Sequence, residues 1–424
     1  MSYPNNQTFA TWSPAPSPSV AIMVFPTRYG APAVAVSAEE NKLSDVELAG
    51  ATVETAADPP DVSYQRLAGA LFVAACMGLV FGAAMELSKV TNPASIRGVF
   101  LIEKSLMLKM FLSATATSAL SFAVLAVAAP KRMEAARKEF MGCGCGKGIP
   151  AVVLGAFLLG CGMALAGSCP GMVLIQIGSN VQNAWVTVLG GLAAAMLYGA
   201  FVPSFEHLLK IGRVSQVKLE DFSLLNSVAF HKLAVGLFVL LSTVVALFEI
   251  FLPWDLELPT RVAPGAQALP PSAMGAIVGL LQVPCVLFLG DTLGSSSAYM
   301  TLASTPAGIS QSLSAATPHL SKYRSGLGNW WQVVYLFGAA AGAAISSSAT
   351  LTLGTTPGVG YAEAFIGGFV MILGSRLASG CTSGHGLSGF ALLAVHSIVA
   401  VPAMFAGGIL VAFSYQAIDP TYRM

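Results

Sequence analysis

One cysteine stands in a short break between two apolar stretches, where its thiol could meet a solute. Residues 167–171 read Gly-Ser-Cys-Pro-Gly, and Cys169 is the cysteine. Pro170 fixes φ and has no N–H, so it suits the first turn of a new helix, which makes Cys169 the predicted N-cap. The free N–H groups and the dipole at a helix start attract an anion. We therefore expect Cys169, with Ser168 and Gly171, to line the path of an anion.

A second cysteine lies in a similar break with more polar neighbours. Residues 379–384 read Ser-Gly-Cys-Thr-Ser-Gly, which places Ser383 and Gly384 beside Cys381. His385 follows closely, so it shares a face with Cys381 if this stretch is helical. A buried cysteine also serves as a small apolar filler, and that interpretation is preferred for either cysteine alone. Two cysteines in matching motifs at helix breaks favour a functional role.

Charged side chains inside apolar stretches give a second signal. Arg376 stands inside such a stretch, shortly before Cys381. An arginine at the centre of a membrane helix costs about 2.5–3.5 kcal/mol on insertion, so it usually faces a cavity or a partner. Arg376 could attract an anion there, or its side chain could reach the nearby aqueous face. Glu86 and Asp291 are expected at the membrane interface, and Lys109 is expected to extend toward water.

The remaining cysteines give weaker signals. Cys76 and Cys285 occupy corresponding places in the two halves of the chain, where they either line the same path or pack. Cys161 is expected to pack. Cys143 and Cys145 lie in a basic segment, where two thiols could exchange sulfur with a soluble cytoplasmic carrier protein or bind a soft metal. Two thiols without further ligands are a weak metal signal, so an exposed loop is the simpler interpretation, and no metal or cofactor is predicted.

The composition requires a membrane around these motifs. The chain of 424 residues is 55% hydrophobic and 10% charged, with a mean hydropathy of +0.72. Soluble domains carry roughly a quarter of their residues as charged side chains, so this chain cannot cover its surface in water. The net charge of +1 gives no sign of a nucleic-acid partner. The cysteines are odd in number, which does not indicate a secreted disulfide framework.

Apolar stretches that are long enough to cross the bilayer define the elements. A helix needs about 20 residues to span roughly 30 Å of hydrocarbon. The stretches that qualify, nine in all, are 67–85, 106–129, 150–166, 184–202, 233–252, 273–289, 331–353, 362–378 and 392–415. Shorter apolar pieces follow breaks rich in Gly, Pro or Ser, as re-entrant half-helices do, at 95–102, 172–177, 297–303 and 387–393. The predicted fold class is an all-α polytopic membrane protein.

The order of these elements divides the chain into two related halves. Residues 1–63 are rich in proline and acidic side chains and are expected to form a disordered tail. Repeat 1 covers 64–205, a connecting segment with one span covers 206–272, repeat 2 covers 273–416, and a C-terminal tail covers 417–424. With a single span between them, the repeats are inverted, as in many transporters. Coincidence among Gly- and Ala-rich segments is the alternative.

Loop charges predict the orientation. The loops on the side of the N-terminus carry more lysine and arginine than the opposite loops. Cytoplasmic loops hold this excess in membrane proteins. We therefore expect a cytoplasmic N-terminus, an external C-terminus and a place in the plasma membrane.

Three motifs give the chain a resemblance to a known family. Residues 167–171 form the first motif, and 377–389, which read Leu-Ala-Ser-Gly-Cys-Thr-Ser-Gly-His-Gly-Leu-Ser-Gly, form the second. With the stretch 79–99, they resemble the signature segments of the YeeE/YedE sulfur-transport family of bacterial-type thiosulfate uptake proteins. The resemblance covers about residues 65–415. The N-terminal tail and the basic segment at 130–149 depart from the family pattern.

The resemblance implies an hourglass of inverted repeats whose functional cysteines match Cys169 and Cys381, with Cys285 as a further candidate. It also implies thiosulfate as the substrate, which has a soft terminal sulfur and a hard, charged sulfonate end. A weak S–H donor suits the first end, whereas helix N-termini, Ser and Arg suit the second. Binding must stay weak and multi-site for an anion to move on.

The predicted function is import of a small sulfur-containing anion by a bilayer-embedded protein that is not an enzyme. Two other classes stay open from the sequence. A membrane-embedded thiol redox enzyme would use Cys381 as nucleophile and His385 as base, but no carboxylate lies in that motif to orient the histidine. A small-solute channel could use paired half-helices, but such a pore does not need thiols.

Overall fold

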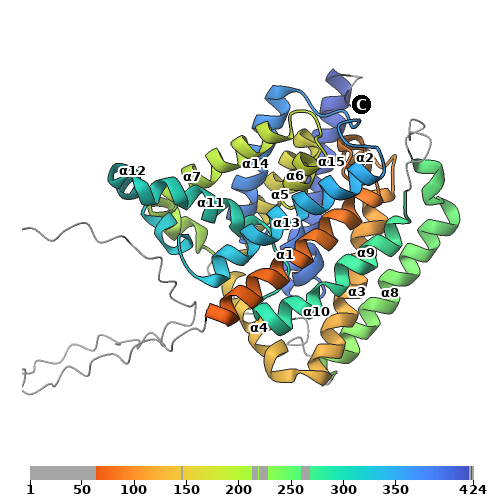
Figure 1. Cartoon of the computed structure of the whole chain (residues 1–424), viewed down its shortest axis with the longest axis horizontal. Helices are drawn as coiled ribbons and strands as arrows, with labels where there is room; N and C mark the ends of the chain where they lie inside the picture. The colour runs from red at the N-terminus through yellow and green to blue at the C-terminus, as the bar shows by residue number, and fades with distance from the viewer. Residues whose placement is uncertain are drawn as a thin grey trace, which may run out of the picture.

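Helices form the regular elements of the computed structural model wherever it describes the chain (Figure 1). The described residues are 64–144, 147–212, 218, 228–258, 268–419 and 422. The long helices are α1 (Tyr64–Leu87), α3 (Leu106–Ala128), α5 (Ile149–Ala166), α7 (Ala184–Leu209), α8 (Phe230–Phe251), α13 (Leu327–Ala349), α14 (Tyr361–Ala378) and α15 (Val395–Ile418). The shorter ones are α2 (Pro93–Phe100), α4 (Pro130–Gly144), α6 (Met172–Gly178), η2 (Trp254–Glu257), α9 (Pro271–Leu280), α10 (Gln282–Pro284), η3 (Cys285–Leu289), α11 (Ser296–Ile309), α12 (Gln311–Ala316), η4 (Pro318–Tyr323) and η5 (Thr382–Gly389).

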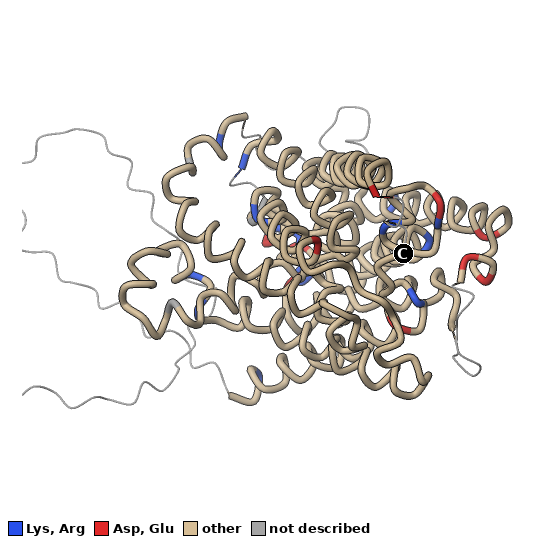
Figure 2. Tube along the Cα trace, turned by 90° about the horizontal axis from the view of Figure 1, so that it is seen from above, with Lys and Arg blue, Asp and Glu red and all other residues tan. Residues whose placement is uncertain are grey.

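Nine helices of the described chain are long and apolar enough to cross a membrane, which confirms the nine predicted spans. In the sixth span, α9, α10 and η3 follow one another over Pro271–Leu289. Figure 2 shows Lys, Arg, Asp and Glu in short stretches of the trace, with long uncharged runs between them. Because an uncompensated charge is costly in hydrocarbon, this distribution fits a protein surrounded by lipid.

Short helical segments lie where the sequence predicts half-helices. α2 starts at Pro93, and the side chain of Asn92 caps it by accepting the N–H of Ala94 at 2.9 Å. α6 matches the predicted piece closely, whereas α11 extends to Ile309. The last segment differs, because η5 begins at Thr382 instead of inside the apolar run that follows it.

Helices of the first half pack directly on helices of the second half. α5 packs along α14 at the centre, while α1 packs on α13 and α3 packs on α9 (Figure 1). α15 packs on α5, and α7 packs on α14. In the first half, α2 and α6 each lie between two long helices, as η5 does between α14 and α15 in the second half.

Glycines bring α5 and α14 into close contact. A Cβ added at Gly155 would lie 2.3 Å from the backbone nitrogen of Ala378. One added at Gly162 would lie 2.3 Å from the backbone nitrogen of Met371. Small residues let two helix backbones approach in a membrane. This crossing therefore fixes the end of α14, from which the second cysteine motif begins.

Both cysteine motifs begin where a helix of this central pair ends in the left-handed conformation. Gly167 closes α5 with a φ of 56°, and Ser379 closes α14 with a φ of 64°. Glycine adopts this conformation freely, but a residue with a Cβ does so only when its surroundings hold it there. Each cap turns the chain away from its helix and into the break that carries the cysteine.

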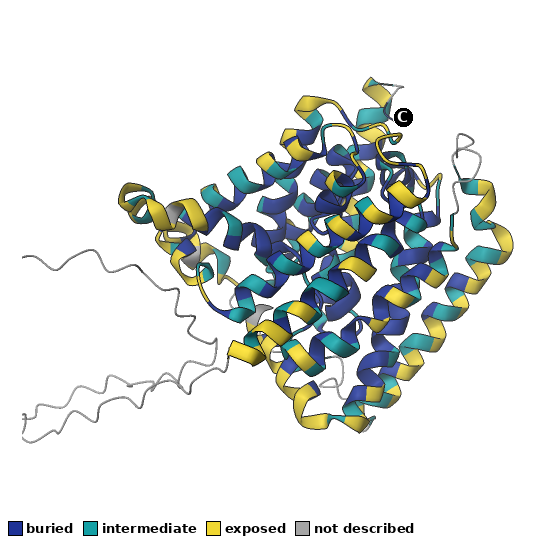
Figure 3. Ribbon diagram, in the orientation of Figure 1, coloured by how far each residue is buried: buried dark blue, intermediate teal, exposed yellow. Residues whose placement is uncertain are grey.

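α8 lies at the edge of the molecule and packs chiefly against α3 (Figures 1 and 3). Lys109 of α3 is fully buried, and its ammonium lies 3.2 Å from Glu249 Oε2 and 3.6 Å from Glu257 Oε1. The carboxylate of Glu257 also caps α3, because it accepts the backbone N–H groups of Ser105 and Leu106. The prediction that Lys109 extends toward water is wrong, because carboxylates from α8 and η2 cover its ammonium.

The basic segment at 130–149 is not simply an exposed loop. Most of it forms α4, which ends at Gly144. Cys143 belongs to the last turn of this helix, while Cys145 lies outside the described residues. The predicted tail at 1–63 lies outside them as well.

A partly buried ion pair joins α2 and α14 and contacts Tyr415 and Tyr422 near the C-terminus. Arg97 Nη2 lies 2.6 Å from Glu363 Oε2, and Tyr415 donates its hydroxyl to Glu363 Oε1 at 2.6 Å. The guanidinium of Arg97 also lies 4.3 Å from the ring centroid of Tyr422 and donates to its carbonyl at 3.1 Å. The hydroxyl of Tyr422 donates to the carbonyl of Ala164 at 2.7 Å. These contacts join α2, α5, α14 and α15.

Candidate functional site

A cavity of about 80 Å³ lies where the second cysteine motif meets the loop before α11. The motif contributes Cys381, Gly384 and His385 to its wall, and α14 contributes Arg376. The opposite wall is the segment 291–297. A water molecule needs roughly 10–15 Å³ of such volume, so the cavity has room for a small anion.

Cys381 is the N-cap of η5 and presents its thiol to two hydroxyl groups. Its Sγ lies 3.2 Å from Ser383 Oγ and 3.3 Å from Ser295 Oγ, and the two oxygens are 3.4 Å apart. A Cβ added at Gly384 would lie 3.9 Å from the same sulfur. Thiols and hydroxyls both donate and accept, so the three groups can redirect their hydrogen bonds without moving a heavy atom. They offer one S–H and two O–H donors to a solute.

The two second-half cysteines each begin a π-helical segment. Cys381 caps η5, and Cys285 opens η3 within the sixth span. Such turns are rare, and they occur frequently at functional sites. Cys285 is fully buried. In the turn before it, Gln282 donates from Nε2 to Ser388 Oγ at 2.8 Å, so the sixth span is tied to η5.

The first cysteine motif forms a tight turn before α6. Gly171 is the N-cap of this helix, so the prediction of Cys169 as the N-cap is wrong. The carbonyl of Cys169 accepts the N–H of Met172 at 2.9 Å and that of Val173 at 3.1 Å. The turn therefore starts at Cys169, although the helix proper starts three residues later, at Met172. Cys169 and Ser168 are both buried.

Ser295 brings the two motifs together. A Cβ added at Gly171 would lie 3.1 Å from Ser295 Oγ, the hydroxyl that contacts Cys381. From α11, Tyr299 donates its hydroxyl to the carbonyl of Pro170 at 3.0 Å. Because Gly171 has no side chain, the hydroxyl of Ser295 has room beside the first motif. Both cysteine motifs thus meet at the start of α11.

His385 lines the cavity but uses both ring nitrogens elsewhere. Nε2 lies 3.0 Å from the carbonyl of Ala378, and Nδ1 lies 3.0 Å from Ser397 Oγ. A carbonyl only accepts, so Nε2 carries a proton. The ring joins η5 to the ends of α14 and α15. The geometry therefore does not supply the cysteine–histidine pair that a thiol enzyme would need.

Arg376 reaches the cavity from the last turn of α14. It is 7% exposed, and its Nε and Nη1 atoms have no hydrogen-bond partner among the described residues. Its carbonyl accepts from the ammonium of Lys147, which precedes α5. Burial, followed by the positive charges of Arg376 and Lys322, holds the pKa of Lys147 well below its usual value. The buried positive charge of Arg376 therefore borders the cavity.

Sequence reasoning missed the segment 291–297 as part of the site. A Ser-Ser-Ser run at 295–297 follows Gly294, the same small-residue pattern that precedes the other short helices. Asp291, predicted at the interface, is half-buried and lines the cavity. Its carboxylate accepts the N–H of Thr292 at 2.7 Å and Nε1 of Trp331 at 3.3 Å. The Gly-Ser signal before α11 could have identified this wall.

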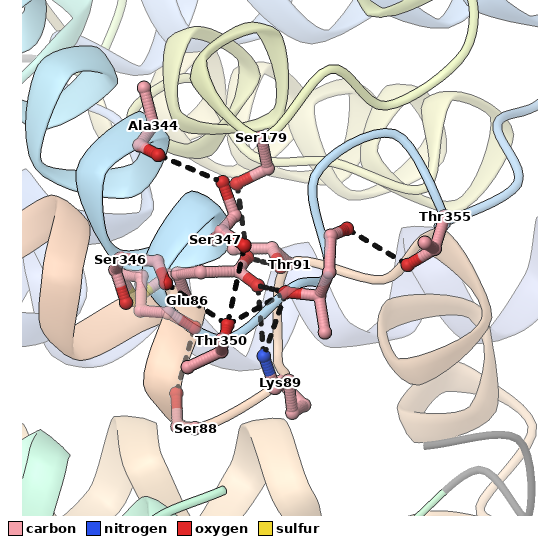
Figure 4. Close-up of polar contacts among 12 residues, drawn as sticks. Glu86, Ser88, Lys89, Thr91, Ser179, Ala344, Ser346, Ser347, Thr350 and Thr355 are labelled. Atoms are coloured by element: carbon pink, nitrogen blue, oxygen red, sulfur yellow. Dashed lines mark hydrogen bonds and ion pairs between the residues drawn. The ribbon is translucent and has the colours of Figure 1, made fainter. Parts of the chain in front are cut away.

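A separate polar network surrounds Glu86 at the end of α1 (Figure 4). Glu86, predicted at the membrane interface, stands at the end of α1 and is 3% exposed. Oε1 accepts from Lys89 at 3.0 Å and from Thr352 at 3.1 Å, while Oε2 accepts from Thr91 at 2.8 Å and from Ser179 at 3.0 Å. The network joins the end of α1 to α6 and to the loop after α13, away from the cavity.

Comparison with known proteins identifies the family. Residues 87–410 match the family model for sulphur transport. The thiosulfate transporter TsuA of Spirochaeta thermophila is 23% identical over 335 residues, which cover 76% of this chain and 92% of that protein. The family match covers most of the chain and includes both cysteine motifs. The chain therefore belongs to the sulphur transport family and is an integral membrane transporter rather than an enzyme.

Proposed function

We propose that the protein imports thiosulfate across the plasma membrane, with its N-terminus in the cytoplasm. The observation that carries this proposal is the thiol of Cys381 at a small cavity, hydrogen-bonded to Ser295 and Ser383. A polarisable S–H group suits the terminal sulfur of thiosulfate, and hydroxyl groups suit its oxygens. Similarity to a thiosulfate transporter of another organism supports the same substrate.

In this proposal the anion passes from the first cysteine motif to the second. Cys169, with Ser168 and Gly171, receives it on the external side, and Cys381, with Ser383 and Gly384, receives it on the cytoplasmic side. The hydroxyl of Ser295 contacts Cys381 and lies close to Gly171 of the first motif, which supports a short transfer between the motifs. Each proposed station offers thiol and hydroxyl groups that hold an anion weakly, as release to the next station requires. Cys285, Arg376 and His385 complete the proposed path.

We further propose that the two halves are inverted repeats. The main contacts between long helices of the two halves have counterparts in which the roles are exchanged: α1 on α13 corresponds to α3 on α9, and α15 on α5 corresponds to α7 on α14. The contact of α5 with α14 corresponds to itself. A two-fold axis in the membrane plane would produce this pattern, and it would bring the two cysteine motifs together near that axis.

A soluble carrier protein on the cytoplasmic side is the proposed recipient of sulfur. Cys143, in the last turn of α4, is the candidate residue for that exchange. A Cys143→Ser variant is expected to import thiosulfate normally in liposomes, where no carrier is present.

Uptake into liposomes tests the transport proposal. Purified protein should carry radiolabelled thiosulfate into the lumen without changing it chemically. The Cys381→Ser variant keeps size and a hydrogen-bond donor but loses the soft sulfur, so it should lose most uptake. Cys161→Ser is the matched control, because the Cys161 thiol lies outside the cavity wall, 3.5 Å from the carbonyl of Gly407. Wild-type uptake by a well-folded Cys381→Ser protein would rule out the relay.

A further inference from the structure

A buried arginine borders the cavity beside Cys381. Arg376 is more than nine-tenths buried, and its Nε and Nη1 atoms have no partner among the described residues. A buried donor without a partner costs about 1–3 kcal/mol, and more when the donor is charged. Such a group in a native protein calls for an explanation, and an ion that completes its hydrogen bonds is one. An anion in this cavity would supply the missing acceptors.

The start of α11 at the opposite wall provides a second set of donors. The first N–H groups of any α-helix have no partner within the helix. Ser295 is the N-cap of α11, yet its side chain makes no capping hydrogen bond and turns to Cys381 and Ser383 instead. No acidic residue lies in the first turn. Ser296 and Ser297 of that turn both line the cavity.

We infer that this cavity is a two-ended site which holds the charged oxygens of the anion between Arg376 and the start of α11. The soft sulfur then points to Cys381, next to Ser295. This inference rests on the proposed function and adds an orientation to it: the oxygens bind to charge and helix dipole, and the sulfur binds to the thiol. Arg376 and the start of α11 thus recognise the charge of the anion, whereas Cys381 recognises its soft sulfur.

The carboxylate of Asp291 on the same wall limits how tightly the site holds an anion. Its oxygens are engaged by the N–H of Thr292 and by Nε1 of Trp331, but the negative charge remains beside the cavity. A transporter must release the solute that it binds, so repulsion between the carboxylate of Asp291 and the anion favours release. The site is therefore built for transient binding of an anion.

Equilibrium binding of radiolabelled thiosulfate and sulfate to the purified full-length protein separates the two ends. Sulfate has the charged oxygens but no soft sulfur. Arg376→Gln should weaken the binding of both anions by about tenfold or more, because it removes charge-assisted hydrogen bonds. Cys381→Ser should weaken thiosulfate binding and leave sulfate binding unchanged. Arg132→Gln, outside the cavity, is the matched arginine control and should bind both anions as the wild type does.

A second variant keeps the test sharp if Arg376→Gln fails to fold. Ser296→Asp places a fixed negative charge in the first turn of α11, where it stabilises the helix but occupies the place of the anion. It should fold normally and lose binding of both anions, while Ser296→Asn should retain binding. Normal binding by well-folded Arg376→Gln and Ser296→Asp proteins would overturn the inference. A wild type that shows this binding pattern but imports no thiosulfate would instead contradict the proposed function alone.

Discussion

At the scale of single residues, the site depends on hydroxyl groups that the cysteine motifs do not contain by themselves. Ser295 comes from the loop before α11 and is far from both motifs in sequence. It contacts the thiol of Cys381 and lies beside Gly171. The two cysteine motifs could be identified from sequence because each combines a cysteine with a helix break. Ser295 could not, because only the packing of α11 between the motifs gives it a role.

Removing the hydroxyl of Ser295 should slow transport without unfolding the protein. A neutral hydrogen bond contributes about 0.5–1.5 kcal/mol, so Ser295→Ala is expected to reduce thiosulfate uptake several-fold. The rate of radiolabelled uptake into liposomes measures this effect. Ser348→Ala, at an exposed position of α13, is the control. Equal rates for both variants would show that Ser295 only fills space.

The Glu86 network should contribute to stability and not to substrate recognition. Glu86→Gln removes the charge that holds the partly buried ammonium of Lys89 and leaves one acceptor in place of two. The expected loss is about 1–3 kcal/mol of unfolding free energy, seen as a lower melting temperature in detergent. Glu103→Gln, at an exposed site, should melt as the wild type does. An unchanged melting temperature for Glu86→Gln would contradict this assignment.

At the scale of elements, the apolar runs of the sequence were sufficient to predict all nine spans. Length and hydropathy decide whether a helix crosses a bilayer, and both are properties of one segment. Whether a polar residue is buried depends on other segments, so burial could not be predicted from a single stretch of sequence. Glu86 and Lys109 both stand near span ends, but the partners that cover them come from α6, α8, η2 and the loop after α13. α4 was missed because its charged sequence reads as a loop.

The close crossing of α5 and α14 gives a prediction at this scale. Gly155→Val would place side-chain atoms against the backbone of Ala378, so the two helices must separate. We expect this variant to lose both stability and thiosulfate uptake. Gly69→Val on α1 is the matched control, because a Cβ added at Gly69 meets nothing within 4 Å. Melting temperature and liposome uptake measure both effects, and a wild-type result for Gly155→Val would show that the crossing can relax.

At the scale of the whole molecule, the two halves hold each other through their own helices. α5 meets α14 at the centre, and α1, α3, α7 and α15 each pack on a helix of the other half. The sequence predicted two related halves from the spacing of the cysteine motifs. It did not predict these contacts, because the partner of each helix is set by the three-dimensional arrangement.

Labelling from outside the cell tests the proposed orientation. In a background without native cysteines, a cysteine at position 424 should react with an impermeant thiol reagent in intact cells. A cysteine at position 2 should react only after the membrane is opened. Labelling of position 2 in intact cells would reverse the orientation and exchange the sides assigned to Cys169 and Cys381.

The place of α8 at the margin of the molecule has a consequence for how the sequence can evolve. Along its length only Ala234, Leu241 and Val245 are buried, and its neighbours are chiefly those of α3. Natural selection therefore requires mainly that this helix stay apolar and long enough to cross the membrane. Exchanges among Leu, Val, Ile and Phe on its outer face should be close to neutral. Among related transporters, this is the span in which we expect sequences to drift fastest.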